Sequence, residues 1–209
     1  MNSRILSLMA AASVAMAAAS VAVATGEAAA LPLGDTAPMA TVKMKSVDGK
    51  EISIGEAAGP KGTLVIFSCN HCPFVKAWET RIAEIGNAYP KKGVGVIVIN
   101  PNDPTAYAED DYAEMQQRAK QRGFEFPYVV DATSEVGRAF GATRTPEAYL
   151  FDQTGKLVYH GTIDDNYQDA GKAKEHFLKD ALDALIAGKE IPVKETKAVG
   201  CSIKFRPKG

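Results

Sequence analysis

Two of the chain's three cysteines lie in the segment Ser68-Cys69-Asn70-His71-Cys72-Pro73, with two residues between them. This CxxC spacing suits thiol-disulfide chemistry, because one thiolate can attack a disulfide and the neighbouring thiol can then resolve the mixed disulfide. The imidazole of His71 lies between the two cysteines and is a candidate donor to a thiolate. We therefore take Cys69, Cys72 and His71 as the candidate catalytic residues.

An apolar run precedes this motif and a helical pattern follows it. Residues 63–67 form a short continuous apolar stretch, which predicts a strand buried on both faces. After the cysteines, apolar residues recur on one helical face, at Phe74, Trp78, Ile82 and Ile85. Cys69 is thus predicted at the start of a helix, where unpaired N–H groups and the helix dipole favour its thiolate. The dipole alone would lower a thiol pKa from about 8.5 to about 7.

The rest of the chain predicts further strands and helices around this unit. Polar and apolar residues alternate through residues 41–54 on either side of Asp48-Gly49, which predicts a hairpin. Apolar runs predict strands, and polar or amphipathic runs predict helices, one of them with Glu114 and Arg118 at i,i+4. These are strands at 93–100 and 126–130, helices at 105–122, 135–140 and 177–186, and a hairpin at 147–160.

The first residues and the composition indicate an exported globular protein. Residues 1–30 combine Arg4, an alanine-rich apolar stretch and a small-residue site at 28–30, which predicts a signal peptide. The prediction is a secreted or periplasmic protein with no stable membrane insertion after cleavage. The remaining residues suit one α/β domain at 31–190 and a tail at 191–209. A formal net charge of −1 without a Lys/Arg cluster gives no basis for nucleic-acid binding.

The order of strand, CxxC, helix, second βα unit, hairpin and closing helix resembles the thioredoxin fold. The hairpin before the first buried strand and the long interval between Cys72 and Pro146 make the chain more similar to the redoxin branch of that superfamily. That branch contains the peroxiredoxins and the exported TlpA-type thiol-disulfide oxidoreductases. The resemblance implies an α/β fold with a central mixed β-sheet flanked by helices, an N-terminal β-hairpin and an inserted βα segment.

The resemblance also implies roles for particular residues. Cys69 would be the attacking thiolate and Cys72 its resolving partner. Thr145-Pro146 matches the position of the cis-proline segment that faces the CxxC, whose backbone pairs with the incoming substrate. The expected partners are protein thiols and disulfides and an upstream redox partner, and no cofactor or metal is expected.

The third cysteine, Cys201, lies in the tail and leaves two alternatives open. As the odd cysteine of an exported protein, it could exchange with the CxxC as an internal resolving thiol, or it could be a buried free cysteine. The ten residue-to-residue steps from Ile191 to Cys201 can span roughly 33–36 Å, enough to cross a domain of this size. The apolar residues Ile203 and Phe205 predict that the tail docks on the domain.

Two enzymatic alternatives fit the motif less well. In peroxiredoxins, a threonine three residues before the peroxidatic cysteine and a later arginine polarise the peroxide. Cys72 aligns with that cysteine, but Cys69 and Pro146 occupy the two helper positions, which argues against peroxidase activity. A general thioredoxin-like reductase is also not expected, because Ser68 and Thr63 replace the tryptophan and the buried acid usual in thioredoxins.

Three non-enzymatic alternatives also fit the motif less well. A closed zinc site needs four ligands, and the sequence offers only Cys201 and the three histidines beside the CxxC, with no second close pair. Of these, His160 and His176 are expected to lie at the surface. Copper-delivery proteins built on this fold use CxxxC and a distant histidine, a spacing that differs from this one. The CxxC could also be an inert structural disulfide, although the start of a helix would be an unusual place for one.

The position of His71 predicts a disulfide more oxidising than that of thioredoxin. A histidine in the same slot of a CPHC motif marks DsbA, whose reduced thiolate is unusually stable. We expect a glutathione redox titration of the Cys69–Cys72 pair to give a reduction potential less negative than the thioredoxin value of about −270 mV. A potential near that value would contradict the role assigned to His71.

Overall fold

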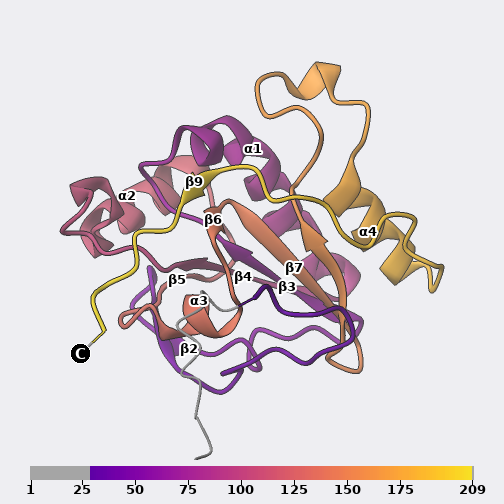
Figure 1. The fold of residues 1–209 in the computed structure, drawn as a ribbon, viewed down its shortest axis with the longest axis horizontal. Coiled ribbons are helices and arrows are strands. Elements are labelled where there is room, and N and C mark those ends of the chain that lie inside the picture. Colours follow the sequence, from indigo (N-terminus) through magenta and orange to yellow (C-terminus); the bar gives the residue numbers. More distant parts are fainter. Residues whose placement is uncertain (1–28, 209) are drawn as a thin grey trace, which may run out of the picture.

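The computed structural model describes residues 29–208, so nearly all of the predicted signal peptide lies outside the described residues. The central sheet has two groups of strands (Figure 1). The first runs in the order β2 (Glu51–Ile52), β1 (Met44–Ser46), β5 (Tyr128–Val130) and β4 (Val94–Asn100). The second runs in the order β3 (Gly62–Phe67), β7 (Glu147–Asp152) and β8 (Leu157–Gly161).

The two groups meet where β3 lies beside β4 in the middle of the sheet (Figure 1). Just past the end of β3, the Ser68 amide donates to the Ile99 carbonyl of β4 at 2.8 Å. Strands β4 and β5 are parallel, whereas β1 pairs antiparallel with β2 and β5, and β7 pairs antiparallel with β3 and β8. The sheet is therefore mixed, as predicted, and β1 and β2 form the predicted N-terminal hairpin.

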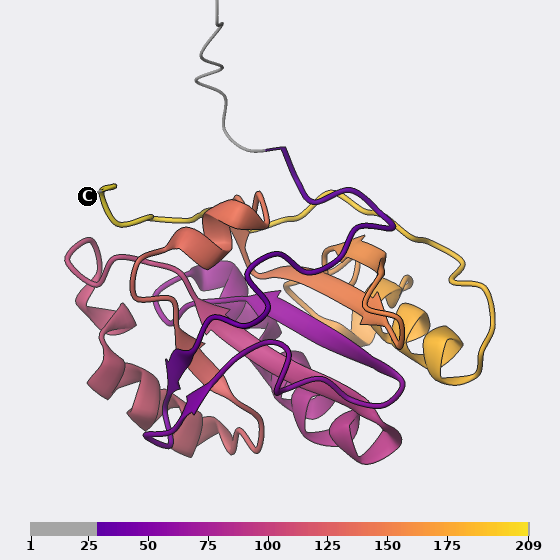
Figure 2. The same ribbon diagram turned by 90° about the horizontal axis from the view of Figure 1, so that it is seen from below.

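Helices cover both faces of this sheet (Figure 2). They are α1 (Pro73–Ala88), α2 (Tyr112–Arg122), α3 (Glu135–Ala139) and α4 (Phe177–Ile186), with short 3-10 turns η1 (Pro90–Lys92), η2 (Ala108–Asp110) and η3 (Ala170–Lys172). Apolar residues of α1, α2 and α4 pack on one face, and those of α3 pack on the other. Within residues 29–208, none of the helices combines the length and the apolar character that crossing a membrane requires.

The alternation of side chains along β3 explains why its sequence is continuously apolar. Leu64 and Ile66 pack in the core beneath α1, whereas Val65 and Phe67 pack in the core on the α3 side. Successive side chains of a strand point to opposite faces, so a strand covered on both faces needs apolar residues at every position. The predicted buried strand is confirmed, and its carboxyl end delivers the chain directly into the CxxC loop.

One predicted helix begins later than expected. The sequence predicts a helix over 105–122, but α2 begins at Tyr112 because the Asp111 side chain caps it by accepting from the Ala113 amide at 2.9 Å. Arg118 does not pair with Glu114 as expected. It crosses to Glu79 of α1, with 3.3 Å between Arg118 Nη1 and Glu79 Oε1. The other predicted strands and helices lie within a few residues of their predicted bounds.

The C-terminal tail docks on the domain, which confirms the prediction drawn from Ile203 and Phe205. It crosses the molecule as an extended chain (Figure 1) and forms the short strand β9 (Cys201–Ser202). This strand pairs antiparallel with β6 (Arg144–Thr145), so that Cys201 lies opposite Thr145 and Ser202 lies opposite Arg144. The tail therefore brings the third cysteine to the segment that carries the predicted cis-proline.

Candidate active site

The two cysteines of the CxxC lie at different distances from the start of α1. Cys72 is the N-cap residue of the helix and Pro73 is its first residue, whereas Cys69 lies in the loop that follows β3. Both cysteines are buried, and both are free thiols. The unpaired amides of the helix start therefore face Cys72 more directly than Cys69.

Thr145 contacts both sulfur atoms. Its hydroxyl Oγ1 lies 3.2 Å from Cys69 Sγ, and its carbonyl oxygen lies 3.1 Å from Cys72 Sγ. The Thr145–Pro146 peptide bond is cis, as the resemblance predicted. The structure thus brings together four of the predicted site residues, namely Cys69, Cys72, Thr145 and Pro146.

The two thiols of the CxxC differ strongly in acidity. The neighbouring Cys69 thiol lowers the pKa of Cys72 to about 5, although burial acts in the opposite direction. The Cys201 thiol and the Val75 amide lower the pKa of Cys72 further. Burial, reinforced by the hydrogen bond to Cys72 and by the Asp110 carboxylate, raises the pKa of Cys69. In this arrangement the contact with Cys69 favours the thiolate form of Cys72. The assignment of the attacking thiolate to Cys69, made from the sequence, stays a prediction.

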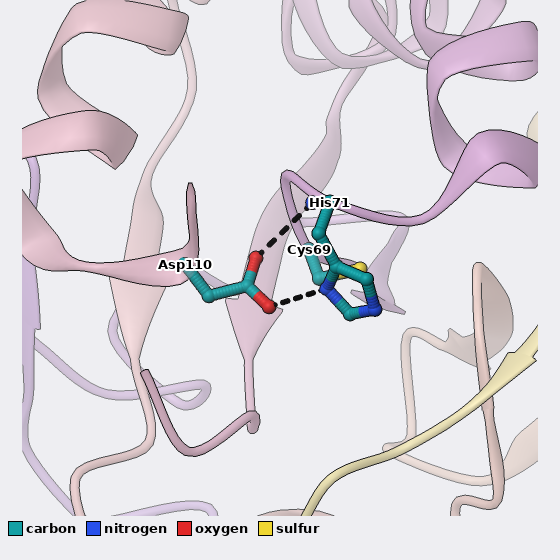
Figure 3. Close-up of side chains that lie close together, drawn as sticks. All are labelled: Cys69, His71 and Asp110. Atoms are coloured by element: carbon teal, nitrogen blue, oxygen red, sulfur yellow. Dashed lines mark hydrogen bonds and ion pairs between the residues drawn. The ribbon is translucent and has the colours of Figure 1, made fainter. Parts of the chain in front are cut away.

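A buried carboxylate holds the CxxC loop in place (Figure 3). Asp110 Oδ1 accepts from the backbone amides of Asn70 at 2.6 Å and His71 at 3.3 Å. Its other oxygen, Oδ2, lies 2.6 Å from His71 Nδ1 and accepts from Asn102 Nδ2 at 2.9 Å. Sequence reasoning missed Asp110, because it belongs to an acidic run within the residues predicted to form a surface helix.

His71 is buried at the edge of this site rather than turned into solvent. Its ring stacks on Tyr107, with 3.8 Å between the ring centroids and 3° between the planes. One ligand atom each from Cys69, His71 and Asp110 lies within 4.8 Å of the others, and such a set could hold a metal ion. A closed structural zinc site takes four ligands, and this group supplies three.

A second buried carboxylate holds the cis-proline loop. Glu147 accepts from the backbone amides of Thr143 and Arg144, each at 2.9 Å, and lies 2.7 Å from His160 Nε2. Burial raises the pKa of Glu147, but these hydrogen bonds outweigh it and leave the pKa below its ordinary value. His160 is therefore a buried partner of this carboxylate, and the prediction that it lies at the surface is wrong.

Cys201 joins the two cysteines of the CxxC. It packs, half-buried, against the cluster of Cys69, Cys72 and Val75. Burial and a hydrogen bond to Cys72 raise the pKa of Cys201 to about 11. The structure therefore places all three thiols of the chain together, with the most acidic one at the helix start.

The acidity of Cys72 predicts the effect of removing its main hydrogen-bond donor. We expect Cys69→Ala to raise the pKa of Cys72 from about 5 toward the ordinary thiol value of about 8.5. The measurement is the ultraviolet absorbance of the thiolate against pH, with Cys201→Ser present so that Cys72 is the thiol that titrates. The absorbance is lost as pH falls through the pKa, so in Cys69→Ala it should disappear at higher pH than in Cys201→Ser alone. An unchanged midpoint would show that Cys69 is not the donor.

Comparison with known proteins gives a family and a fold. The Redoxin family profile matches residues 32–175. Thiol-disulfide oxidoreductase ResA of Geobacillus thermodenitrificans is 27% identical over 139 residues, which cover 66% of this chain and 74% of that protein.

Solved structures extend the likeness to nearly the whole described chain. The crystal structure of an uncharacterized conserved protein from Geobacillus kaustophilus has a TM-score of 0.79 and 38% identity, and the match covers 85% of this chain and 94% of that one. The solution structure of a thioredoxin-like protein in the oxidized form has a TM-score of 0.56 and 20% identity, covering 76% and 97% of the two chains. The second match shows a shared fold, which confirms the predicted thioredoxin fold.

Proposed function

Because the chain belongs to the Redoxin family, we propose that it is a thiol-disulfide oxidoreductase that exchanges disulfides with partner proteins through Cys69 and Cys72. The observation that carries the proposal is a pair of free, buried thiols at the start of α1, both in contact with Thr145 beside cis-Pro146. Relatives named thiol-disulfide oxidoreductase ResA support the same class of reaction.

The acidity of Cys72 sets the order of the exchange. The Cys72 thiolate attacks one sulfur of a partner disulfide, a new S–S bond forms, and the partner's other sulfur leaves and takes up a proton. Cys69 then loses its proton and attacks Cys72 Sγ, which releases the partner's first sulfur as a second thiol. The Cys69–Cys72 pair is oxidised by two electrons and the partner disulfide is reduced by two, and the reverse sequence oxidises a partner dithiol.

Thr145 and Pro146 would present the partner to Cys72. The backbone of Thr145 already pairs with an extended strand, because β6 carries an antiparallel ladder with β9. A free strand edge binds extended peptides through main-chain hydrogen bonds, so a partner segment could pair with β6 in place of β9. Glu147 supports this function by holding the amides of Thr143 and Arg144.

Cys201 is proposed as an internal resolving thiol. Cys201 packs against Cys72 when the tail is docked. If the tail returns to this position after a mixed disulfide has formed at Cys72 Sγ, attack by Cys201 would form a Cys72–Cys201 bond and release the partner's thiol. With a pKa raised to about 11, Cys201 must pass its proton to the departing sulfur as it attacks. Cys69 and Cys201 would then compete for the same sulfur atom.

The proposed place of this reaction is outside the cytoplasm. The prediction of a signal peptide at residues 1–30 supports export, and disulfides persist in oxidising compartments. A repeated reaction then requires an upstream redox partner that resets Cys69 and Cys72 after each turnover. That partner would exchange electrons through the same pair of thiols.

Disulfide exchange and peroxide consumption separate the proposed function from a peroxiredoxin-like one. We expect the purified, reduced protein to reduce a protein disulfide and to consume hydrogen peroxide no faster than an ordinary thiol. Cys72→Ser should lower the rate of exchange by at least about a hundredfold, because it removes the attacking thiolate. His176→Ala is the matched surface control and should leave the rate unchanged. Fast peroxide consumption without disulfide exchange would refute the proposal.

A further inference from the structure

The tail runs through the groove that a partner polypeptide would need. Strand β9 lies antiparallel to β6, with Cys201 opposite Thr145, and the Ile203 amide donates to the Thr143 carbonyl at 3.1 Å. Arg144 Nη1 also donates to the Gly200 carbonyl at 3.4 Å. Tail residues 200–203 therefore follow residues 143–145, which lead directly into cis-Pro146.

The register of the β6–β9 pairing places the Cys201 thiol beside the Cys72 sulfur. Thr145 contacts the sulfur atoms of both Cys69 and Cys72, and the residue opposite Thr145 on the tail is a cysteine. The Cys201 thiol packs against Cys69 and Cys72. A partner cysteine entering the same ladder would have to reach this position to exchange with Cys72.

The residue before that cysteine is constrained to be glycine. A Cβ atom at Gly200 would lie 2.2 Å from the Thr145 carbonyl oxygen and 3.2 Å from the Pro146 nitrogen. Both are backbone atoms, which cannot move aside as the end of a flexible side chain can. Gly200 does not have a positive φ, so the requirement for glycine comes from close approach and not from backbone conformation.

While β9 is paired with β6, the thiols of Cys69 and Cys72 are inaccessible to another protein. Cys72 and Thr145 are each 0% exposed, and Cys69 is 2% exposed. A partner disulfide can reach Cys72 only after β9 has left β6. The reaction proposed above therefore requires the tail to move.

The tail is hydrogen-bonded to the domain on both sides of β9. On one side, Thr196 Oγ1 accepts from the Thr162 amide at 2.9 Å, and the Thr196 amide donates to the His160 carbonyl at 2.9 Å. On the other side, the Lys204 amide donates to Asn102 Oδ1 at 2.8 Å. Between these anchors, the two-residue ladder and the bond from Ile203 hold the strand to the groove.

We propose that β9 is a pseudosubstrate strand. The groove along Arg144 and Thr145 binds an extended polypeptide with glycine immediately before its cysteine, and the chain's own Gly200-Cys201 occupies the groove until such a segment displaces it. This inference rests on the proposed function and adds two properties to it, a substrate class and a competitor within the same chain.

A mutation that displaces β9 from β6 tests whether the tail blocks access to the two thiols of the CxxC. In a Cys201→Ser background, we expect Gly200→Ala to expel β9 from the groove and to speed labelling of Cys69 and Cys72 by a bulky maleimide at least about tenfold. Gly171→Ala in the same background is the matched control, because a Cβ there meets only the end of the Asp169 side chain, at 3.4 Å, and labelling should not change. Equal labelling of Gly200→Ala and Cys201→Ser would overturn the proposal.

The substrate class is tested on the unmodified protein. Two peptides are compared, one with the sequence of residues 198–203 and one with alanine in place of its glycine, each carrying its cysteine as a mixed disulfide with glutathione. We expect at least about tenfold faster exchange with the glycine peptide. Equal rates would overturn the pseudosubstrate proposal while leaving disulfide exchange intact. No exchange with these peptides or with a protein disulfide would instead refute the proposed function.

Discussion

The site depends on the placement of the Cys72 sulfur at the first turn of α1. A helix start alone stabilises a thiolate by at most about 2 kcal/mol, and here the neighbouring Cys69 and Cys201 thiols also act to lower the pKa of Cys72. Strand β3, helix α1 and the cis-proline segment together fix the position of this sulfur. Strand β3 ends where the CxxC loop must begin, α1 starts at the residue after Cys72, and Thr145 borders both sulfur atoms.

Two buried carboxylates fix the loops that meet at this sulfur. Asp110 accepts two backbone amides of the CxxC loop and pairs with His71, and Glu147 accepts two backbone amides of the cis-proline loop and pairs with His160. Buried polar groups need hydrogen-bond partners, so the hydrogen bonds of each carboxyl group favour one loop geometry. The two loops can therefore keep their relative position while the thiols change partners.

The sequence predicts the elements that depend on local apolar patterns. It does not predict contacts between residues far apart in the chain. Strand β3, helix α1 and the docking of the tail follow from apolar periodicity, and Pro146 follows from family resemblance. The N-cap role of Cys72 depends on where the helix begins, which periodicity fixes only to within a turn. The Asp110–His71 contact joins residues 39 positions apart, and nothing local distinguishes Asp110 from its acidic neighbours.

In the proposed mechanism, every exchange passes through the Cys72 sulfur. Trapping of mixed disulfides tests it most directly, with Cys69→Ser/Cys201→Ser compared against Cys72→Ser on the same partner disulfide. We expect the first variant to accumulate a stable adduct at Cys72, because both resolving thiols are gone, and the second variant to form none. A stable adduct at Cys69 in Cys72→Ser, with none at Cys72 in the double variant, would contradict it.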